Sequence, residues 1–254
     1  MNLDFDLSVA TNYHSNAQRA RVLTEDWIAN NMYCPRCGSV RLTHLKNNQK
    51  VADFCCPSCK NEFELKSKSG KLSSKMNDGA YSAMIERITS LNNPDFFFLS
   101  YDKEKARVVD LMFVPKYLFV PQVIEKRKKL SDDARRKGWV GCNILLNSIP
   151  SQGRITIVHN GNVIEKEDVL SAVAKARPLQ VQDITSRGWL FDVLNCVNAL
   201  PQVFSLSDVY KFTEVLQAQH PDNNHIEAKI RQQLQLLRDK GFLQFLGNGM
   251  YRRL

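Results

Sequence analysis

The sequence predicts an α/β protein, in which a core built on a mixed β-sheet carries a four-cysteine zinc site and is followed by a C-terminal winged-helix domain. Three observations predict this class. Two apolar runs, 96–101 and 108–114, are typical of buried strands and follow a helical segment. Two Cys-x-x-Cys pairs lie close together in the first quarter of the chain. From Ser186 onward the pattern changes to three amphipathic helices and a hairpin.

Length and composition agree with a folded protein of the cytoplasm. The chain has 254 residues, of which 43% are hydrophobic and 24% charged, values that are typical of globular rather than collagen-like, coiled-coil or disordered proteins. No run reaches the roughly 18 apolar residues of a membrane span, and the first residues lack the pattern of a signal peptide. We therefore expect a cytoplasmic protein without a membrane partner. The formal net charge of +9 favours a polyanionic partner such as nucleic acid.

The first part of the chain is expected to form helix, hairpin and helix. A capping box that starts at Ser15 begins a helix that ends near residue 31. Short strands at 51–54 and 63–67 flank the second cysteine pair, so that a metal ion there would clip the turn of a hairpin. A second helix is expected over 78–91, where apolar residues recur at helical spacing up to an Asn-Asn-Pro stop.

The rest of the core is less regular in sequence. After the two buried strands, residues 115–150 look irregular and include two basic stretches. A final strand is expected at 154–159, and about 20 less patterned residues follow it. We place the domain boundary where the helical pattern resumes, which gives a core domain over 1–182 and a winged-helix domain over 183–254.

The seven cysteines are spaced for a metal site. Their odd number and the lack of an export signal argue against a disulfide framework. Four of them form two Cys-x-x-Cys pairs separated by 18 residues, which is typical of a structural zinc ion surrounded by four thiolates. Cys55 competes with Cys56, but three residues instead of two would separate it from Cys59. Cys142 and Cys196 have apolar neighbours and are expected in the core. The predicted zinc ligands are Cys34, Cys37, Cys56 and Cys59.

A second set of residues has the pattern of a metal-dependent phosphodiesterase. Glu64 and Lys66 lie two apart on an expected strand, so their side chains point to the same face, and a paired strand can place Asp53 beside them. The carboxylates of Asp53 and Glu64 and the carbonyl of Leu65 are hard oxygen ligands that suit Mg2+. The Lys66 ammonium can orient or activate the attacking water. The alternative is a pair of surface strands that alternate Glu and Lys. Glu25 is either a further carboxylate near the metal or a solvent-facing residue of the first helix.

The C-terminal pattern of three helices and a hairpin is the order of a winged helix-turn-helix. Apolar residues at helical spacing from Ile226 to Leu237 define the buried stripe of the third helix, and Gly241 follows its end. The opposite face suits base edges and phosphates in a major groove, although an ordinary solvated face or a protein contact would have the same pattern. That face holds His225, Ala228, Arg231, Gln232 and Gln235.

A basic segment lies within the irregular part of the core. Residues 126–137 include seven basic and two acidic residues, and Trp139 follows them. We expect Arg135 and Arg136 to hold phosphates and Trp139 to contact DNA, because the neighbouring glycines allow a close approach of the backbone. A core anchor is the alternative for Trp139.

Eight segments, spread over nearly the whole chain, together match one known family. They are 20–27, 33–38, 51–54, 62–68, 77–81, 93–99, 134–143 and 230–234. In these segments the chain resembles the DpnI-like, or type IIM, methylation-dependent restriction endonucleases of the PD-(D/E)XK superfamily.

The resemblance implies a PD-(D/E)XK nuclease core with an embedded zinc site, followed by a winged helix. It implies a type II restriction endonuclease that cleaves both strands of double-stranded GATC carrying N6-methyladenine, with Mg2+ as the catalytic metal and 5′-phosphate ends. The catalytic roles map onto Asp53, Glu64 and Lys66, and both domains read the methylated site. Ala52 replaces the proline that often precedes the first aspartate, but that proline supplies no ligand. We further expect a bacterial enzyme that is a monomer in solution.

Two other functions remain open. One is a zinc-ribbon and winged-helix regulator that binds DNA without cutting it, and the other is a repair nuclease of the same fold that ignores methylation. Methyl reading has a physical basis, because an N6-methyl group adds apolar surface in the major groove that is worth roughly 1 kcal/mol when buried. We expect Trp139 to form part of the apolar wall that the methyl group meets.

Overall fold

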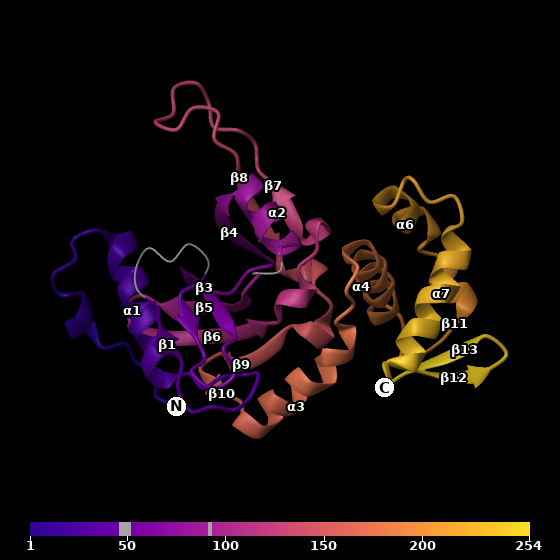
Figure 1. The fold of residues 1–254 in the computed structure, drawn as a ribbon, viewed down its shortest axis with the longest axis horizontal. Helices are drawn as coiled ribbons and strands as arrows, with labels where there is room; N and C mark the ends of the chain where they lie inside the picture. Colours follow the sequence, from indigo (N-terminus) through magenta and orange to yellow (C-terminus); the bar gives the residue numbers. More distant parts are fainter. Residues whose placement is uncertain (46–51, 91–92) are drawn as a thin grey trace.

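A seven-stranded mixed sheet is the largest element of the computed structural model, which describes residues 1–45, 52–90 and 93–254. Its strand order is β1-β2-β3-β5-β6-β9-β10 (Figure 1). β3 and β5 pair in parallel, and the other neighbours pair antiparallel. The strands are β1 (Thr43–His44), β2 (Phe54–Cys55), β3 (Glu62–Ser69), β5 (Asp95–Asp102), β6 (Arg107–Val114), β9 (Ile155–His159) and β10 (Asn162–Val163).

Helices α1 (Asn16–Asn31) and α3 (Lys166–Ala176) pack against one face of this sheet (Figure 1). Trp27 of α1 and Val169 of α3 belong to one buried cluster with Phe97 and Leu99 of β5. Because side chains alternate along a strand, the phenylalanines on either side of Phe97 point to the opposite face. The apolar run at 96–101 is therefore a strand that is buried on both faces.

A second, smaller sheet covers the opposite face. It has the order β4-β8-β7 with antiparallel pairs, and helix α2 packs beside it. Met84 of α2 and Ile144 of β8 share a buried cluster with Phe96 and Phe98. The elements are β4 (Lys75–Ala80), α2 (Tyr81–Thr89), β7 (Ile124–Lys126) and β8 (Gly141–Leu145).

The second sheet corrects two of our expectations. Residues 78–80 belong to strand β4, so the helix that we expected over 78–91 begins only at Tyr81 and ends at Thr89; residues 91 and 92 lie outside the described part. The region 115–150, which looked irregular, supplies β7 and β8. Its strands are short, β8 pairs with β4 across more than 60 residues of chain, and β7 pairs with β8, so a local hydrophobic pattern does not reveal them.

Other boundaries are closer to expectation. α1 runs over Asn16–Asn31 with Ser15 at its N-cap, although the Ser15 side chain makes no capping hydrogen bond. The strand expected at 51–54 is the shorter β2, and residue 51 lies outside the described part. Within the poorly patterned stretch 160–182, α3 forms an 11-residue helix. Single turns of 3-10 helix lie at Leu7–Ala10, Lys116–Leu118, Pro121–Val123, Leu146–Ser148, Ser151–Gly153 and Arg177–Leu179.

The C-terminal domain has the helices and the sheet of a winged helix-turn-helix. The second expected helix is divided in two, α5 and α6, around Lys211 and Phe212. The hairpin is joined by a third strand, β11, in the order β11-β13-β12. The elements are α4 (Ile184–Asn198), β11 (Val203–Ser205), α5 (Leu206–Tyr210), α6 (Thr213–Gln219), α7 (Ile226–Asp239), β12 (Leu243–Gly247) and β13 (Met250–Arg253).

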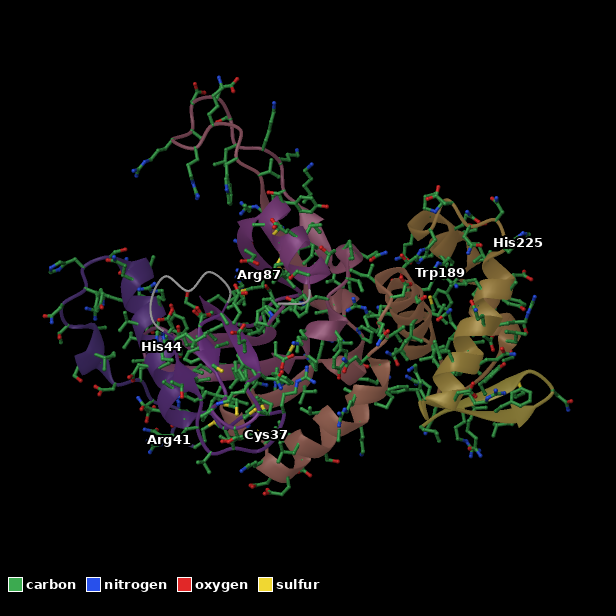
Figure 2. All side chains as sticks on the ribbon, viewed as in Figure 1. Cys37, Arg41, His44, Arg87, Trp189 and His225 are labelled. Carbon is green, nitrogen blue, oxygen red and sulfur yellow. The ribbon has the colours of Figure 1, made fainter. Side chains whose placement is uncertain are left out.

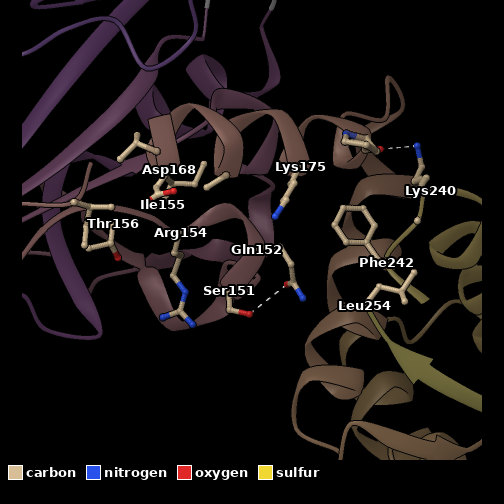
Figure 3. A pocket seen from close by; sticks show the side chains of 15 residues that line it. Ser151, Gln152, Arg154, Ile155, Thr156, Asp168, Lys175, Lys240, Phe242 and Leu254 are labelled. Carbon is tan, nitrogen blue, oxygen red and sulfur yellow. Dashed lines mark hydrogen bonds between the residues drawn. The ribbon is translucent and has the colours of Figure 1, made fainter. Parts of the chain in front are cut away.

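Helix α4 joins the two parts of the molecule. Arg187 Nη1 donates to the carbonyl of Tyr117 (3.1 Å), and Asn195 Nδ2 donates to the carbonyl of Ser148 (2.8 Å). The buried cluster that contains Phe96 continues through α4 into α7. On another side of this contact, a cavity of about 620 Å3 separates α3 from the base of the wing, which is the hairpin of β12 and β13 (Figure 3).

The two remaining cysteines are core residues, as expected. Cys142 and Cys196 are buried, and burial raises the pKa of Cys142 to about 11 and that of Cys196 to about 12. Both thiols are therefore protonated and unreactive at neutral pH. Within the described ranges, the helices are all too short or too polar to span a membrane.

Candidate functional site

The four predicted zinc ligands converge beside the hairpin of β2 and β3. Their Sγ atoms lie within 4.8 Å of one another, and the pairs Cys34–Cys59 and Cys37–Cys56 are each separated by 3.6 Å. Zn–S bonds near 2.3 Å in a tetrahedron space the sulfurs about 3.8 Å apart, so this cluster could hold a zinc ion. Cys55 lies outside it and directs its Sγ to the carbonyl of Cys56 (3.6 Å).

The two Cys-x-x-Cys pairs have the same backbone turn. The N–H groups of Gly38 and Lys60 donate to the carbonyls of Cys34 (2.8 Å) and Cys56 (3.0 Å), respectively. The N–H of each of these first cysteines donates to the carbonyl five residues later. Both Gly38 and Lys60 have left-handed backbones, with φ of 75° and 59°. The same turn therefore uses glycine in one pair and lysine in the other.

A buried ion pair ties the first cysteine pair to the central sheet. Arg36 lies between Cys34 and Cys37, and its Nε and Nη2 donate to the two carboxylate oxygens of Asp95 at 2.8 and 2.6 Å. Asp95, at the start of β5, is fully buried and also accepts the N–H of Lys116 (2.8 Å). The cysteine cluster is thereby fixed to the strand that pairs with β3.

Asp53 lies at the edge of β3, immediately before β2. Its Oδ2 accepts the N–H of Leu65 at 2.7 Å, and its own N–H donates to the carbonyl of Phe63 at 2.9 Å. Because N–H and C=O of one strand residue point to the same side, the Leu65 carbonyl is also directed to the edge that Asp53 occupies. Burial raises the pKa of Asp53, although the Leu65 N–H opposes that shift.

Glu64 and Lys66 share one face of β3, as their spacing predicts. Their Oε1 and Nζ atoms lie 2.5 Å apart. Lys66 also pairs with Asp78 of β4, and Glu64 also pairs with Arg87 of α2. Burial lowers the pKa of Lys66, but the two carboxylates outweigh it and hold the pKa above the ordinary value, so the ammonium is charged.

Glu25 faces the candidate site instead of solvent. Only 14% of its side chain is exposed, and its Oε2 lies 3.0 Å from His44 Nε2. Its charge contributes to the raised pKa of Asp53, which places it near that carboxylate. In the described part of the chain, however, the cysteine cluster is the only group of three or more metal-ligating side chains whose ligand atoms lie within 4.8 Å of one another. Glu25, Asp53 and Glu64 do not converge that closely.

Three residues of this site escaped the sequence analysis, namely His44, Asp78 and Arg87. His44 lies on a two-residue strand, and Arg87 lies on a helix whose apolar side alone had a pattern. Asp78 fell within an expected helix, and the only signal for it was its place in the segment 77–81 that carries the family resemblance.

The basic segment forms a loop that projects from the end of the second sheet, between β7 and β8 (Figure 1). Arg135 and Arg136 are exposed, and the Arg136 guanidinium lies over the Trp139 ring at 4.5 Å from its centroid. Trp139 is half-buried and belongs to neither of the two core clusters. Gly141 is needed beneath it, because an added Cβ would lie 2.8 Å from the ring.

Helix α7 presents the predicted polar face to solvent. Ile226, Ile230, Leu234 and Leu237 are buried, as the helical spacing predicts. Arg231 donates a hydrogen bond to Tyr210 Oη at 2.5 Å. Figure 2 places His225 at the start of α7 on the outside of the domain. All the predicted residues of this face are exposed, namely His225, Ala228, Arg231, Gln232 and Gln235.

Two family models cover almost the whole chain. The model of the Dam-replacing family, DpnI, matches residues 1–182, and the model of the Dam-replacing HTH domain matches residues 185–253. The chain belongs to the DpnI family. Membership in the DpnI family makes the protein a methylation-dependent restriction endonuclease, which is a DNA-binding nuclease with an HTH domain.

Proposed function

We propose that the protein is a type II restriction endonuclease of the PD-(D/E)XK superfamily that cuts both strands of GATC carrying N6-methyladenine and leaves 5′-phosphate ends. The observation that carries this proposal is that, in a member of the DpnI family, Asp53 accepts the N–H of Leu65 at the edge of β3 while Glu64 and Lys66 meet on the adjoining face of that strand. Two carboxylates, a carbonyl and an ammonium group around one strand are the groups that metal-dependent phosphodiester hydrolysis uses.

The donor set fits Mg2+. The carboxylates of Asp53 and Glu64 and the carbonyl of Leu65 would hold the ion through hard oxygen atoms. When bound, Mg2+ would lower the pKa of a coordinated water molecule and stabilise negative charge on the phosphate. Lys66 is charged and hydrogen-bonded, so it can orient the attacking water or neutralise a phosphate oxygen. The Leu65 N–H holds Asp53 Oδ2 in place, which would leave Oδ1 to the metal ion.

Zinc would have a structural role. Four thiolates close the coordination sphere and leave no position for substrate. The cluster clips the β2–β3 turn, whose two strands carry Glu64 and border Asp53. We therefore propose that Cys34, Cys37, Cys56 and Cys59 bind Zn2+ and that the ion positions the catalytic edge.

Both parts of the molecule would contact DNA. The projecting loop offers Arg135 and Arg136 for phosphates and Trp139 for the methyl group, while α7 offers its exposed polar face for the major groove. If Trp139 forms the methyl wall, Trp139→Ala lowers the preference for methylated over unmethylated duplex by about fivefold, since one buried methyl group is worth roughly 1 kcal/mol. An unchanged ratio of the two dissociation constants contradicts this role.

One plasmid, prepared with and without adenine methylation at GATC, tests the proposed function. With Mg2+, wild type should cut only the methylated plasmid, and Asp53→Ala or Lys66→Ala should lower the rate by at least about 100-fold while methyl-selective binding persists. Lys68→Ala is the matched control, since Lys68 lies on the same face of β3 but donates to Ser73 Oγ (3.1 Å).

The alternatives give different patterns in the same experiment. Cleavage of both plasmids would show a nuclease that ignores methylation. Binding without cleavage of either plasmid would show a regulator. Full activity of Asp53→Ala would overturn the assignment of the site even if the plasmids were discriminated.

A further inference from the structure

Both carboxylate oxygens of Glu64 are occupied by cations. Oε1 lies 2.5 Å from Lys66 Nζ, and Oε2 pairs with Arg87 Nη1. Lys66 in turn pairs with Asp78, so the four side chains form a chain of alternating charge from α2 through β3 to β4. Exposure of these side chains ranges from 11% for Asp78 to 26% for Arg87, so solvent screens the contacts only in part.

These ion pairs compete with metal binding at Glu64. A metal ion held by Asp53 and Glu64 needs at least one Glu64 oxygen, and each of these oxygens already lies against a cation, so a metal ion would compete with Lys66 and Arg87 for the charge of Glu64. Lys66 can give up Glu64 at little cost, because it keeps Asp78. Arg87 lies in the last turn of α2, where the helix dipole stabilises a cation without Glu64.

We propose that Arg87 is a positioning residue that competes with a metal ion for Glu64 and thereby lowers the metal affinity of the site; Lys66, which keeps Asp78, is the cation that would exchange with the metal ion at Glu64 Oε1. Asp78 holds Lys66 during the exchange. This inference rests on the proposed function, because it assumes that Asp53 and Glu64 are the metal ligands. Arg87 thereby sets the metal affinity of the protein before any phosphodiester bond is cut.

Mn2+ binding to the zinc-loaded full-length protein, followed by the electron paramagnetic resonance signal of free Mn2+, tests the exchange without reference to cleavage. Arg87→Gln should bind Mn2+ at least about threefold more tightly than wild type, since it removes a half-buried competing ion pair. Arg87→Lys keeps a cation and should stay close to wild type. Arg87→Met serves as the second uncharged variant should Arg87→Gln fail to fold.

Lys68→Gln distinguishes the effect of a direct contact with Glu64 from the effect of any positive charge near the site. It removes a positive charge from the same face of β3 without touching Glu64, so its Mn2+ affinity should differ from wild type by less than about twofold. Equal tightening in Lys68→Gln and Arg87→Gln, or no tightening in Arg87→Gln, would overturn the proposal.

Asp53→Asn distinguishes this failure from failure of the proposed function. It should abolish the Mn2+ site seen in wild type. If Asp53→Asn binds Mn2+ as wild type does, the metal site itself is misassigned. If Asp53→Asn loses binding but Arg87→Gln does not tighten it, only the role of Arg87 is wrong.

Discussion

Arg36 illustrates how much a single side chain can connect. It stands inside the first cysteine pair, forms a two-pronged contact with the buried Asp95, and lies over the Tyr117 ring at 5.4 Å from its centroid. Asp95 begins β5, which pairs with β3. One guanidinium therefore connects the cysteine cluster, the central sheet and the segment that leads toward the second sheet.

The Arg36–Asp95 pair should be costly to break from one side. Arg36→Met leaves Asp95 buried with only the Lys116 N–H, and removal of one partner of a buried ion pair costs about 3–5 kcal/mol. Urea unfolding of the zinc-loaded protein measures this loss. Adding Asp95→Asn to Arg36→Met should recover part of it, because no buried charge then remains unpaired. If the double variant loses as much stability as the two single variants together, this account is wrong.

At this scale the sequence predicts residues that share a strand or a turn. Glu64 and Lys66 are two apart on β3, and the cysteine spacing depends only on two local turns. Asp78 and Arg87 come to Glu64 and Lys66 from other elements, and His44 reaches Glu25 from a two-residue strand. Such contacts depend on the packing of the second sheet and of α1, which no local pattern encodes.

Among the elements, the paired cysteine turns form a natural comparison. Gly38 and Lys60 occupy equivalent positions with the same left-handed backbone and the same hydrogen bond. At Gly38, an added Cβ would lie 3.2 Å from Leu170 Cδ1, so a side chain meets both conformational and steric resistance. At Lys60, a residue with a side chain already has the left-handed backbone, so the native protein already includes that conformational cost.

Alanine should therefore act differently in the two turns. Gly38→Ala should lower the free energy of unfolding by roughly 1 to 2 kcal/mol, the cost of a left-handed residue with a side chain. Lys60→Ala exchanges one left-handed side chain for another and should change it by less than about 0.5 kcal/mol. Thermal unfolding of both variants with zinc bound measures the difference. Equal losses would show that the turns are not equivalent.

The sequence predicts helices and strands correctly where hydrophobic residues recur along the segment with one clear period. The stripes of α1 and α7 and the apolar run of β5 were recognisable because burial selects their residues directly. Residues 75–80 have little apolar pattern and become β4 only by pairing with β8, which itself lies more than 60 residues further on. α3 buries only Val169, Val173 and Ala176, too few for a clear period.

In the whole molecule, α4 belongs to both parts. Its contacts with the nuclease part involve Arg187, Gly188 and Asn195, and Phe191 lies on the same side of the helix by its spacing. Phe191 is 1% exposed and joins the cluster that runs from β5 to α7. The two family matches meet at the start of this helix, but the packing does not divide there.

The shared cluster predicts joint unfolding. Phe191→Ala should lower the stability of the full chain by about 3–5 kcal/mol, as expected for loss of a buried aromatic ring. Loss of helical circular dichroism and release of zinc to a colorimetric chelator should shift to lower urea together, because both parts lose the same support. Two separate transitions, with zinc release at the same urea concentration as in wild type, would show that the nuclease part unfolds independently of the winged-helix part.

The cavity between α3 and the base of the wing makes the two sides of the contact between the nuclease part and the winged-helix part unequal. On the α4 side, hydrogen bonds and buried side chains fill the contact, whereas the opposite side contains about 620 Å3 of space lined by Ala172 and Phe242, among others (Figure 3). Lys240 Nζ bridges that side by a hydrogen bond to the carbonyl of Pro178 (2.6 Å), a single exposed contact where the other side has buried packing. The two sides of the joint are therefore held unequally, the α4 side through its core and the α3 side through one hydrogen bond at the surface.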